Sequence, residues 1–299
     1  MSKVAILVHR HAPLDRHGYW LKAIAELWQQ NGVEVTVTDD PRRRVEAELA
    51  ILHVDLTVVP KDYLAWAERF AVTINGAVAD ISKRAISRHL VRRGDGYDGP
   101  VIVKTDRNCG GDPELRLASS RRATGRAGDV VGGVLDWLDE KRRRRQRRRR
   151  YGGSRPYRDY RVFASPAEVP AAVWGDDELV VERFMAERRD GHYCVRTWLF
   201  LGDRDRHALF WSQDPVIKGH NIVGFERLGD VPAALRQRRR ELGFDFGKFD
   251  YVMVDGQPAL FDANRTPAIG DFPRERYLPL VQTLAGGLDG FLRQRTTAA

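Results

Sequence analysis

The chain has 299 residues, of which 42% are hydrophobic, and this length suits two or three lobes around a cleft. Its formal net charge of +9 is concentrated in residues 141–150, KRRRRQRRRR, where nine of ten positions are basic. The rest is close to neutral, so the overall charge does not by itself indicate a nucleic-acid-binding protein. Only Cys109 and Cys194 are present, far apart, which excludes a disulfide framework and a zinc ribbon.

The sequence contains no signal for a membrane or for export. No stretch approaches the roughly 18 apolar residues that cross a bilayer. The first residues, MSKVAILVHRHAP, lack the long apolar region and the cleavage site of a secretory signal. We therefore expect a protein of the reducing cytoplasm with no membrane partner.

Residues 1–78 alternate strand and helix signals. Residues 3–8, KVAILV, form a continuous apolar run that is typical of a strand buried on both faces. Apolar residues at three- and four-residue spacing predict a helix over 19–30, which Asn31-Gly32 ends. Further strands are predicted at 33–37, 56–60 and 71–75. Strands and a helix joined by short connections indicate a small parallel α/β lobe.

The middle of the chain, residues 79–184, contains a long segment without strand signals. It opens with a predicted helix over 80–93 that Asp80 caps, followed by a strand, PVIVKT, that carries Lys104. Residues 105–158 form the segment without strands, and a helix is predicted within it. The remaining predicted elements are that helix at 130–145, strands at 159–163 and 178–184, and a short helix after Ser165-Pro166.

Two hairpins are predicted in residues 185–299. The first joins strands at 192–202 and 207–213 around Gly202-Asp203. The second spans 248–267 and turns at Asp255-Gly256, a dipeptide that favours a two-residue hairpin loop.

Three oxygen-bearing side chains meet on the second hairpin. Asp262 and Asn264 are two residues apart on one strand, so they project from the same face, and the turn returns that strand to Asp250. Magnesium prefers oxygen ligands of this kind. Alternatively these residues only flank a turn, where Asp and Asn are common. The apolar neighbours of Asp262 place it within the strand, which favours a metal site.

The pattern D-x(11)-D-x-N-x-x-P, formed by Asp250, Asp262, Asn264 and Pro267, resembles the C-terminal signature of the ATP-grasp superfamily. Its members include D-alanine–D-alanine ligase, glutathione synthetase and the ligases that add glutamate to protein tails. The resemblance covers roughly residues 3–285 and implies ATP and Mg²⁺, or Mn²⁺, as cofactors. The superfamily usually has Glu at the middle position, so Asp262 is a shorter variant.

The resemblance also implies a fold of mixed α/β and α+β type. Residues 1–78 would form an N-terminal parallel α/β lobe, 79–184 a first ATP-grasp lobe with the insertion at 105–158, and 185–299 a C-terminal lobe that carries the metal site. The two ATP-grasp lobes would grip ATP between them.

The resemblance assigns further residues to the nucleotide. Lys83 and Lys104 match two lysines that reach the phosphates. Glu182 and Phe184, in VVERF, would flank the adenine base. Arg196 corresponds to an arginine that contacts the terminal phosphate, and Lys218 lies where some members place another phosphate-binding lysine. The alternatives are surface lysines, a structural ion pair at Arg196 and a core side chain at Phe184.

The superfamily also has a short glycine-rich loop over the phosphates, where this chain has its long insertion. Gly152-Gly153-Ser154 is the first candidate for this loop, because the backbone amides of small residues can cradle phosphate oxygens. Cys109-Gly110-Gly111 is the second, and either could instead be a flexible turn. Residues 141–150 are either a solvated charge run or a basic lid that binds polyanions weakly and without sequence preference.

The implied activity is an ATP- and Mg²⁺-dependent ligase that joins a carboxylate to an amine through an acyl phosphate. Its substrates would be small molecules or peptides, and catalysis would depend on positioning and electrostatics. One alternative is an ATP-grasp kinase that phosphorylates a small molecule. The other is a basic nucleic-acid-binding protein, although only three tyrosines, Tyr151, Tyr157 and Tyr160, lie near the arginine run.

Overall fold

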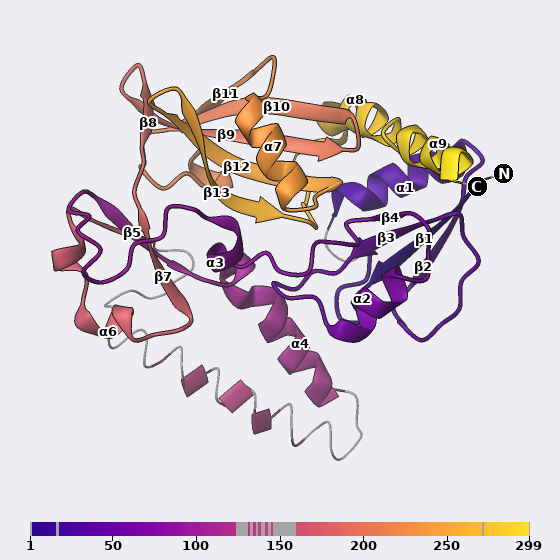
Figure 1. The fold of residues 1–299 in the computed structure, drawn as a ribbon, viewed down its shortest axis with the longest axis horizontal. Helices are drawn as coiled ribbons and strands as arrows, with labels where there is room; N and C mark the ends of the chain where they lie inside the picture. Colours follow the sequence, from indigo (N-terminus) through magenta and orange to yellow (C-terminus); the bar gives the residue numbers. More distant parts are fainter. Residues whose placement is uncertain are drawn as a thin grey trace. The chain divides into compact units, whose positions relative to one another are not determined.

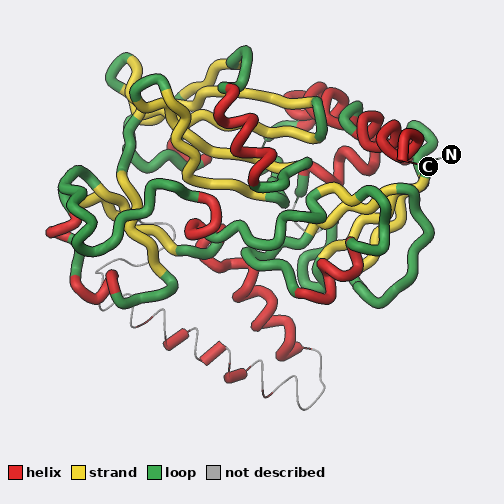
Figure 2. The backbone as a smooth tube through the Cα atoms, in the orientation of Figure 1, coloured by secondary structure: helices red, strands yellow, loops and turns green. Residues whose placement is uncertain are grey.

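The computed structural model describes residues 2–15, 18–123, 160–270 and 272–298, together with isolated positions between 131 and 145. The chain divides into two compact units. Unit 1 is formed by Met1–Asp80 and Ala186–Ala299, and unit 2 by Ile81–Met185. Figures 1 and 2 show the helices and strands of both units. No helix among the described residues combines the length and apolar character needed to span a membrane.

Unit 1 contains a four-stranded parallel sheet with the strand order β2-β1-β3-β4. Its elements are β1 (Lys3–Val8), α1 (Trp20–Gln30), β2 (Glu34–Thr38), β3 (Leu49–His53), α2 (Lys61–Ala67) and β4 (Thr73–Ile74). The two central strands are apolar and buried almost throughout, as expected for a parallel sheet covered on both faces. The strands predicted at 3–8, 33–37 and 71–75 and the helix at 19–30 are confirmed, with β4 shorter than expected.

The strand predicted at 56–60 is wrong. The strand of this region is β3, at Leu49–His53, where all five residues are buried. The segment after it runs as a loop whose backbone carbonyls accept hydrogen bonds from the Arg265 side chain. In the apolar run LTVVP, Leu56, Thr57 and Val59 are buried outside any strand, and a distant arginine satisfies the carbonyls of Leu56 and Thr57.

The second sheet of unit 1 is antiparallel, with the order β11-β10-β9-β12-β13 and β8 paired to β9. Its strands are β8 (Glu187–Arg189), β9 (His192–Leu201), β10 (Arg204–Ser212), β11 (Gly224–Arg227), β12 (Phe246–Val254) and β13 (Gln257–Asn264). Both predicted hairpins are confirmed. Asp255 and Gly256 have φ of 50° and 75°, as a type I′ turn requires.

Three helices complete unit 1, and the sequence did not predict them: α7 (Ala233–Glu241), α8 (Arg274–Ala285) and α9 (Leu288–Ala298). Leu199, Leu201 and Phe246 of the antiparallel sheet share one hydrophobic core with α1, α8 and α9. Trp28 of α1 donates its indole N–H to the carbonyl of Ala285 at 2.9 Å. The two sheets of unit 1 are thus joined through a common apolar cluster.

Unit 2 is built on a three-stranded antiparallel sheet, β6-β5-β7. Its elements are α3 (Lys83–Ile86), β5 (Val101–Thr105), α4 (Asp112–Ala123), β6 (Arg161–Phe163), α6 (Ala171–Trp174) and β7 (Leu179–Arg183). The predicted strands of this region are confirmed, and α4 was not predicted. Described positions between 131 and 145, where a helix was predicted, are helical, but most of that segment lies outside the described residues. A parallel sheet in unit 1 and antiparallel sheets in both units confirm the mixed α/β and α+β class.

The helix predicted over 80–93 is wrong in length and in its cap. It spans only Lys83–Ile86, and its N-cap is Ser82, whose hydroxyl accepts a hydrogen bond from the N–H of Ala85. Beyond it the chain is extended and pairs with β7, where Val91 donates its N–H to Val181 at 2.8 Å. Pairing with a sheet edge therefore overrides the helical pattern of the sequence.

Candidate active site

Asp250 and Asp262 lie directly opposite each other on β12 and β13. Thr197 of β9 is the partner of Asp250 on its other side, and its hydroxyl donates to Asp250 Oδ1 at 2.9 Å. The ammonium of Lys248 lies 2.8 Å from Asp250 Oδ2. Directly paired residues project from the same face of a sheet, so both carboxylates occupy one face. The structure therefore brings these two of the three predicted metal ligands together.

A β-bulge produces this pairing. The hairpin register runs from Val254↔Gln257 to Tyr251↔Leu260 and then shifts by one residue, so that Asp250 is opposite Asp262 and Phe261 is the extra residue. Without the bulge Asp250 would face Phe261, and Asp262 would project from the opposite face. The bulge therefore puts the Asp262 carboxylate on the same face of the sheet as that of Asp250.

Asn264 lies opposite Lys248, in the next row of paired residues on the same face of the sheet. A series of hydrogen bonds holds its side chain. Its Oδ1 accepts the N–H of Thr266 at 2.8 Å. The Thr266 hydroxyl donates to Asp55 Oδ1 at 3.1 Å, and the Tyr19 hydroxyl donates to Asp55 Oδ2 at 2.8 Å. Asp55 follows β3, so the carboxyl edge of the parallel sheet anchors the end of the hairpin.

These residues fit a magnesium ion. Two carboxylates and an amide are hard oxygen donors. Like charges directly opposite each other destabilise a strand pair, and a nearby cation, such as the Lys248 ammonium 2.8 Å from Asp250, relieves that repulsion. No group of three His, Cys, Asp or Glu side chains in the described part of the chain is placed to hold a metal, so Asn264 is needed as the third donor. Its Oδ1 accepts the Thr266 N–H at 2.8 Å and lies 3.3 Å from the Thr266 hydroxyl, which is also within hydrogen-bond distance of Asp55.

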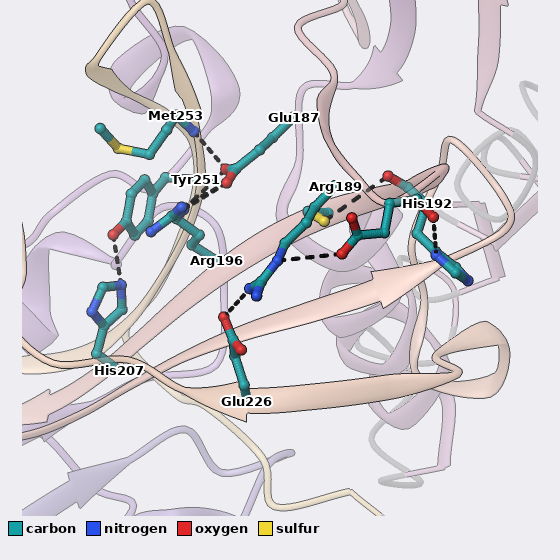
Figure 3. A network of polar contacts seen from close by, with 10 residues as sticks. Glu187, Arg189, His192, Arg196, His207, Glu226, Tyr251 and Met253 are labelled. Carbon is teal, nitrogen blue, oxygen red and sulfur yellow. Dashed lines mark hydrogen bonds and ion pairs between the residues drawn. The ribbon is translucent and has the colours of Figure 1, made fainter.

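Arg196 lies on the opposite face, because it is adjacent to Thr197 in β9 and pairs with Tyr251 instead of Asp250. Figure 3 shows its guanidinium against Glu187, whose carboxylate accepts bonds of 2.7–3.0 Å from it. This bond raises the pKa of Arg196, and Glu187 also accepts the N–H of Met253. The structure does not bring Arg196 together with Asp250, and its role toward phosphate stays a prediction.

The same face carries a buried pair, Tyr251 and His207, 2.6 Å apart (Figure 3). His207 Nδ1 lies 3.2 Å from the carbonyl of Gly229, which makes Nδ1 the protonated nitrogen and leaves Nε2 to accept the tyrosine proton. Burial raises the pKa of Tyr251 to about 12 and lowers the pKa of His207. Both groups are therefore neutral at pH 7, which suits a structural pair.

In unit 2 the structure brings Lys104 and Glu182 together. Both side chains are buried, at 8% and 1% exposed, and they form an ion pair between β5 and β7. Ser87 donates its hydroxyl to the other carboxylate oxygen of Glu182. Lys83, also buried, is the first residue of α3, and Phe184 donates its backbone N–H to Pro100 at 2.8 Å. The carboxylate of Glu182 is therefore occupied in positioning Lys104.

The two candidate phosphate loops differ in what the structure describes. Cys109, Gly110 and Gly111 lie a few residues after the end of β5 and have φ of 47°, 68° and 76°. Gly152, Gly153 and Ser154 lie outside the described residues, as does most of 141–150. In unit 1, Lys218 precedes a 3₁₀ turn at Gly219–Asn221, and Asn221 accepts its backbone N–H at 2.8 Å. The roles of these residues stay predictions.

Sequence reasoning missed Arg265, the residue that follows Asn264. It is 0% exposed and donates to backbone carbonyls that lie far away in the sequence. The acceptors are Val54 at 3.0 Å, Thr57 at 3.0 Å, Val78 at 2.7 Å and Leu56. A lone arginine after a strand has no local signal for such a role, because its acceptors are set by tertiary packing.

His53, the last residue of β3, was also missed. It is 1% exposed, neither ring nitrogen has a hydrogen-bond partner, and Tyr19 packs edge-on against it at 4.8 Å. Burial lowers its pKa to about 4. A histidine in this setting is kept neutral in the folded state.

We expect His53 to make stability fall in mild acid. Its pKa is lower folded than unfolded, so the unfolded chain binds the proton first, and stability is lost as pH falls from about 6.5 toward 4. At pH 5 the loss due to this group is about 2 kcal/mol. Urea unfolding of wild type and His53→Leu at pH 7 and pH 5 measures it, with the exposed His220→Gln as control. Equal losses in all three proteins would contradict the assignment.

No family model and no curated protein matches this sequence. Among solved structures, a RimK domain protein ATP-grasp from Sphaerobacter thermophilus DSM 20745 is 15% identical, with 96% of this chain and 97% of that chain covered and a TM-score of 0.45. D-alanine–D-alanine ligase from Bacillus anthracis complexed with ATP is 12% identical, with 100% and 99% covered and a TM-score of 0.43. Macrocyclase MdnC from Microcystis aeruginosa MRC, bound with precursor peptide MdnA, is 12% identical, with 96% and 98% covered and a TM-score of 0.41.

These neighbours are ATP-grasp ligases. They come from the superfamily that Asp250, Asp262 and Asn264 resemble.

Proposed function

We propose that this chain is an ATP-dependent ligase that joins a carboxylate to an amine. The observation that carries the proposal is the pairing of Asp250 with Asp262 on one face of the antiparallel sheet, with Asn264 in the next row. Opposed carboxylates cost stability unless a cation neutralises them, and a site that keeps them is suited to bind one. A magnesium ion held there would neutralise charge on nucleotide phosphates.

The chain's own residues hold this donor set in place. Thr197 and Lys248 each bond one oxygen of Asp250, and Thr266 fixes the Asn264 amide. Ligands whose orientation is fixed by hydrogen bonds need little reorganisation when charge develops. Such support is expected at a catalytic site and is not needed at a simple hairpin turn.

Two lysines of unit 2 form a separate part of the proposal. Lys104 is a buried ammonium that Glu182 orients, and we propose that it and Lys83 bind nucleotide phosphates. An ammonium is a compact charge that suits phosphate oxygens.

The reaction then follows in two transfers. An oxygen of the substrate carboxylate attacks the γ-phosphorus of ATP, ADP leaves, and an acyl phosphate forms. The amine attacks the acyl carbon, inorganic phosphate leaves, and the amine proton passes to solvent. The role of the protein is to position and neutralise charge, as in other phosphoryl transfers.

ADP release in the presence of Mg²⁺, measured over a panel of carboxylates with and without amines, tests the activity. A ligase gives an amide, ADP and phosphate in equal amounts, and only when both substrates are present. A phosphorylated hydroxyl compound would make the protein a kinase instead. Failure to bind a non-hydrolysable ATP analogue with Mg²⁺ would refute both the ligase and the kinase.

Lys104→Met is expected to weaken binding of that analogue by about 1.5–3 kcal/mol, the worth of a charge-assisted hydrogen bond. Isothermal titration measures it, with the exposed Lys61→Met as the matched control. Because the substitution leaves Glu182 buried and unpaired, the double variant Lys104→Met/Glu182→Gln should recover stability without recovering affinity. Recovery of affinity in the double variant would assign Lys104 to structure alone.

A further inference from the structure

Two arginines project from the same face as the opposed carboxylates. One row of directly paired residues crosses the antiparallel sheet from Arg227 through Ala208, Thr197 and Asp250 to Asp262. Since paired residues project from one face and alternate residues share it, Arg206, two positions before Ala208 in β10, joins this face. The row is therefore basic at one end and acidic at the other.

The two arginines are close enough to repel each other. Burial and the positive charge of Arg227 lower the pKa of Arg206. The Nε of Arg206 is buried and has no hydrogen-bond partner. A desolvated guanidinium beside a second one is costly without an anion.

Among the described residues, two neighbouring arginines of the same sheet, Arg189 and Arg196, have carboxylate partners, unlike Arg206 and Arg227. Arg189 forms an ion pair with Glu226, the residue next to Arg227. Arg196 forms an ion pair with Glu187, in which a guanidinium nitrogen lies 2.7 Å from a carboxylate oxygen. Within the described part of the chain, neither Arg206 nor Arg227 forms an ion pair with a carboxylate. The sheet therefore carries two guanidinium groups, those of Arg206 and Arg227, that a bound anion would neutralise.

The spacing along the row suits a small ligand. Neighbouring strands lie about 4.8 Å apart, so three steps separate the backbones of Arg227 and Asp250 by roughly 14 Å. An arginine side chain covers part of that distance, and the residues between them, Ala208 and Thr197, have small side chains. A molecule of a few bonds could therefore reach from the guanidinium groups to the carboxylate end of the row.

We propose that Arg206 and Arg227 bind an anionic group, a carboxylate or a phosphate, at the far end of the substrate whose reacting carboxylate would lie beside a cation held by Asp250 and Asp262. This rests on the proposed function and narrows its substrate to small molecules with two anionic groups. The planar guanidinium fork matches both anions, and two forks side by side favour a dianion over a singly charged acid.

Titration calorimetry at constant ionic strength tests the site, with and without Mg²⁺ and the ATP analogue. The probes are glutarate, phosphoserine and acetate, and the proteins are wild type, Arg206→Gln/Arg227→Gln and the control Arg189→Gln. We expect wild type and control to bind glutarate or phosphoserine more tightly than acetate. The double variant should bind that probe roughly tenfold to a hundredfold more weakly, with unchanged affinity for the nucleotide analogue.

The outcomes separate the two proposals. Equal affinity of the double variant and wild type for each dianion, or no dianion binding under either condition, would overturn the arginine site. Dianion binding that depends on the arginines, in a protein that binds no Mg²⁺-nucleotide, would keep the arginine site and refute the ligase. Preference for glutarate identifies a carboxylate as the anchored group, and preference for phosphoserine identifies a phosphate.

Discussion

Asp262→Asn is expected to lower Mg²⁺-dependent ATP turnover by a factor on the order of a thousand, because it removes one charge from the metal donor set and keeps its shape. In the absence of Mg²⁺ the same variant should be no less stable than wild type, since Asp250 then faces a neutral amide instead of a like charge. Steady-state ADP release and urea unfolding measure the two effects. A residue with a structural role alone would lose stability without a selective loss of turnover.

The matched control for Asp262 is Asp203→Asn, an exposed carboxylate in the turn between β9 and β10 of the same sheet. It should change neither turnover nor stability. Mg²⁺ with the ATP analogue should also raise the melting temperature of wild type and of this control more than that of Asp262→Asn, because a ligand stabilises the state that binds it. Full turnover in Asp262→Asn would remove the metal assignment and, with it, the observation that carries the proposed function.

Arg265→Met is expected to lower the free energy of unfolding by about 3–5 kcal/mol. The substitution keeps much of the side-chain length but leaves the buried carbonyls of Val54, Leu56, Thr57 and Val78 without their donor. Each buried carbonyl left unpaired costs part of its desolvation energy. Equilibrium urea unfolding measures the loss.

Arg276→Met, at an exposed position of α8, is the control for Arg265 and should change the free energy of unfolding by less than about 0.5 kcal/mol. Because Arg265 follows Asn264 and the loop it holds leads from Asp55, the variant should also weaken Mg²⁺-nucleotide binding before it unfolds. Wild-type stability in Arg265→Met would mean that water or another side chain satisfies these carbonyls.

Local signals in the sequence were sufficient to predict the final hairpin and its turn. Asp255-Gly256 specifies a turn through two residues with positive φ, and Asp262 and Asn264 share a face because strand side chains alternate. The buried strand at Lys3–Val8 and the helix that follows it were equally clear, because the period of apolar residues is a property of a short window. Each of these features depends on residues close together in the chain.

Tertiary structure decided the rest. The bulge at Phe261 places Asp262 opposite Asp250, and a count of residues from the turn puts it on the other face. The latter part of the segment 80–93, which was predicted as a helix, instead pairs with β7. The side chain of Arg265 donates hydrogen bonds to backbone carbonyls of a loop that was predicted as a strand. In the last two cases the partner is far away in the sequence, and its hydrogen bonds outweigh a local preference worth less than about 1 kcal/mol per residue.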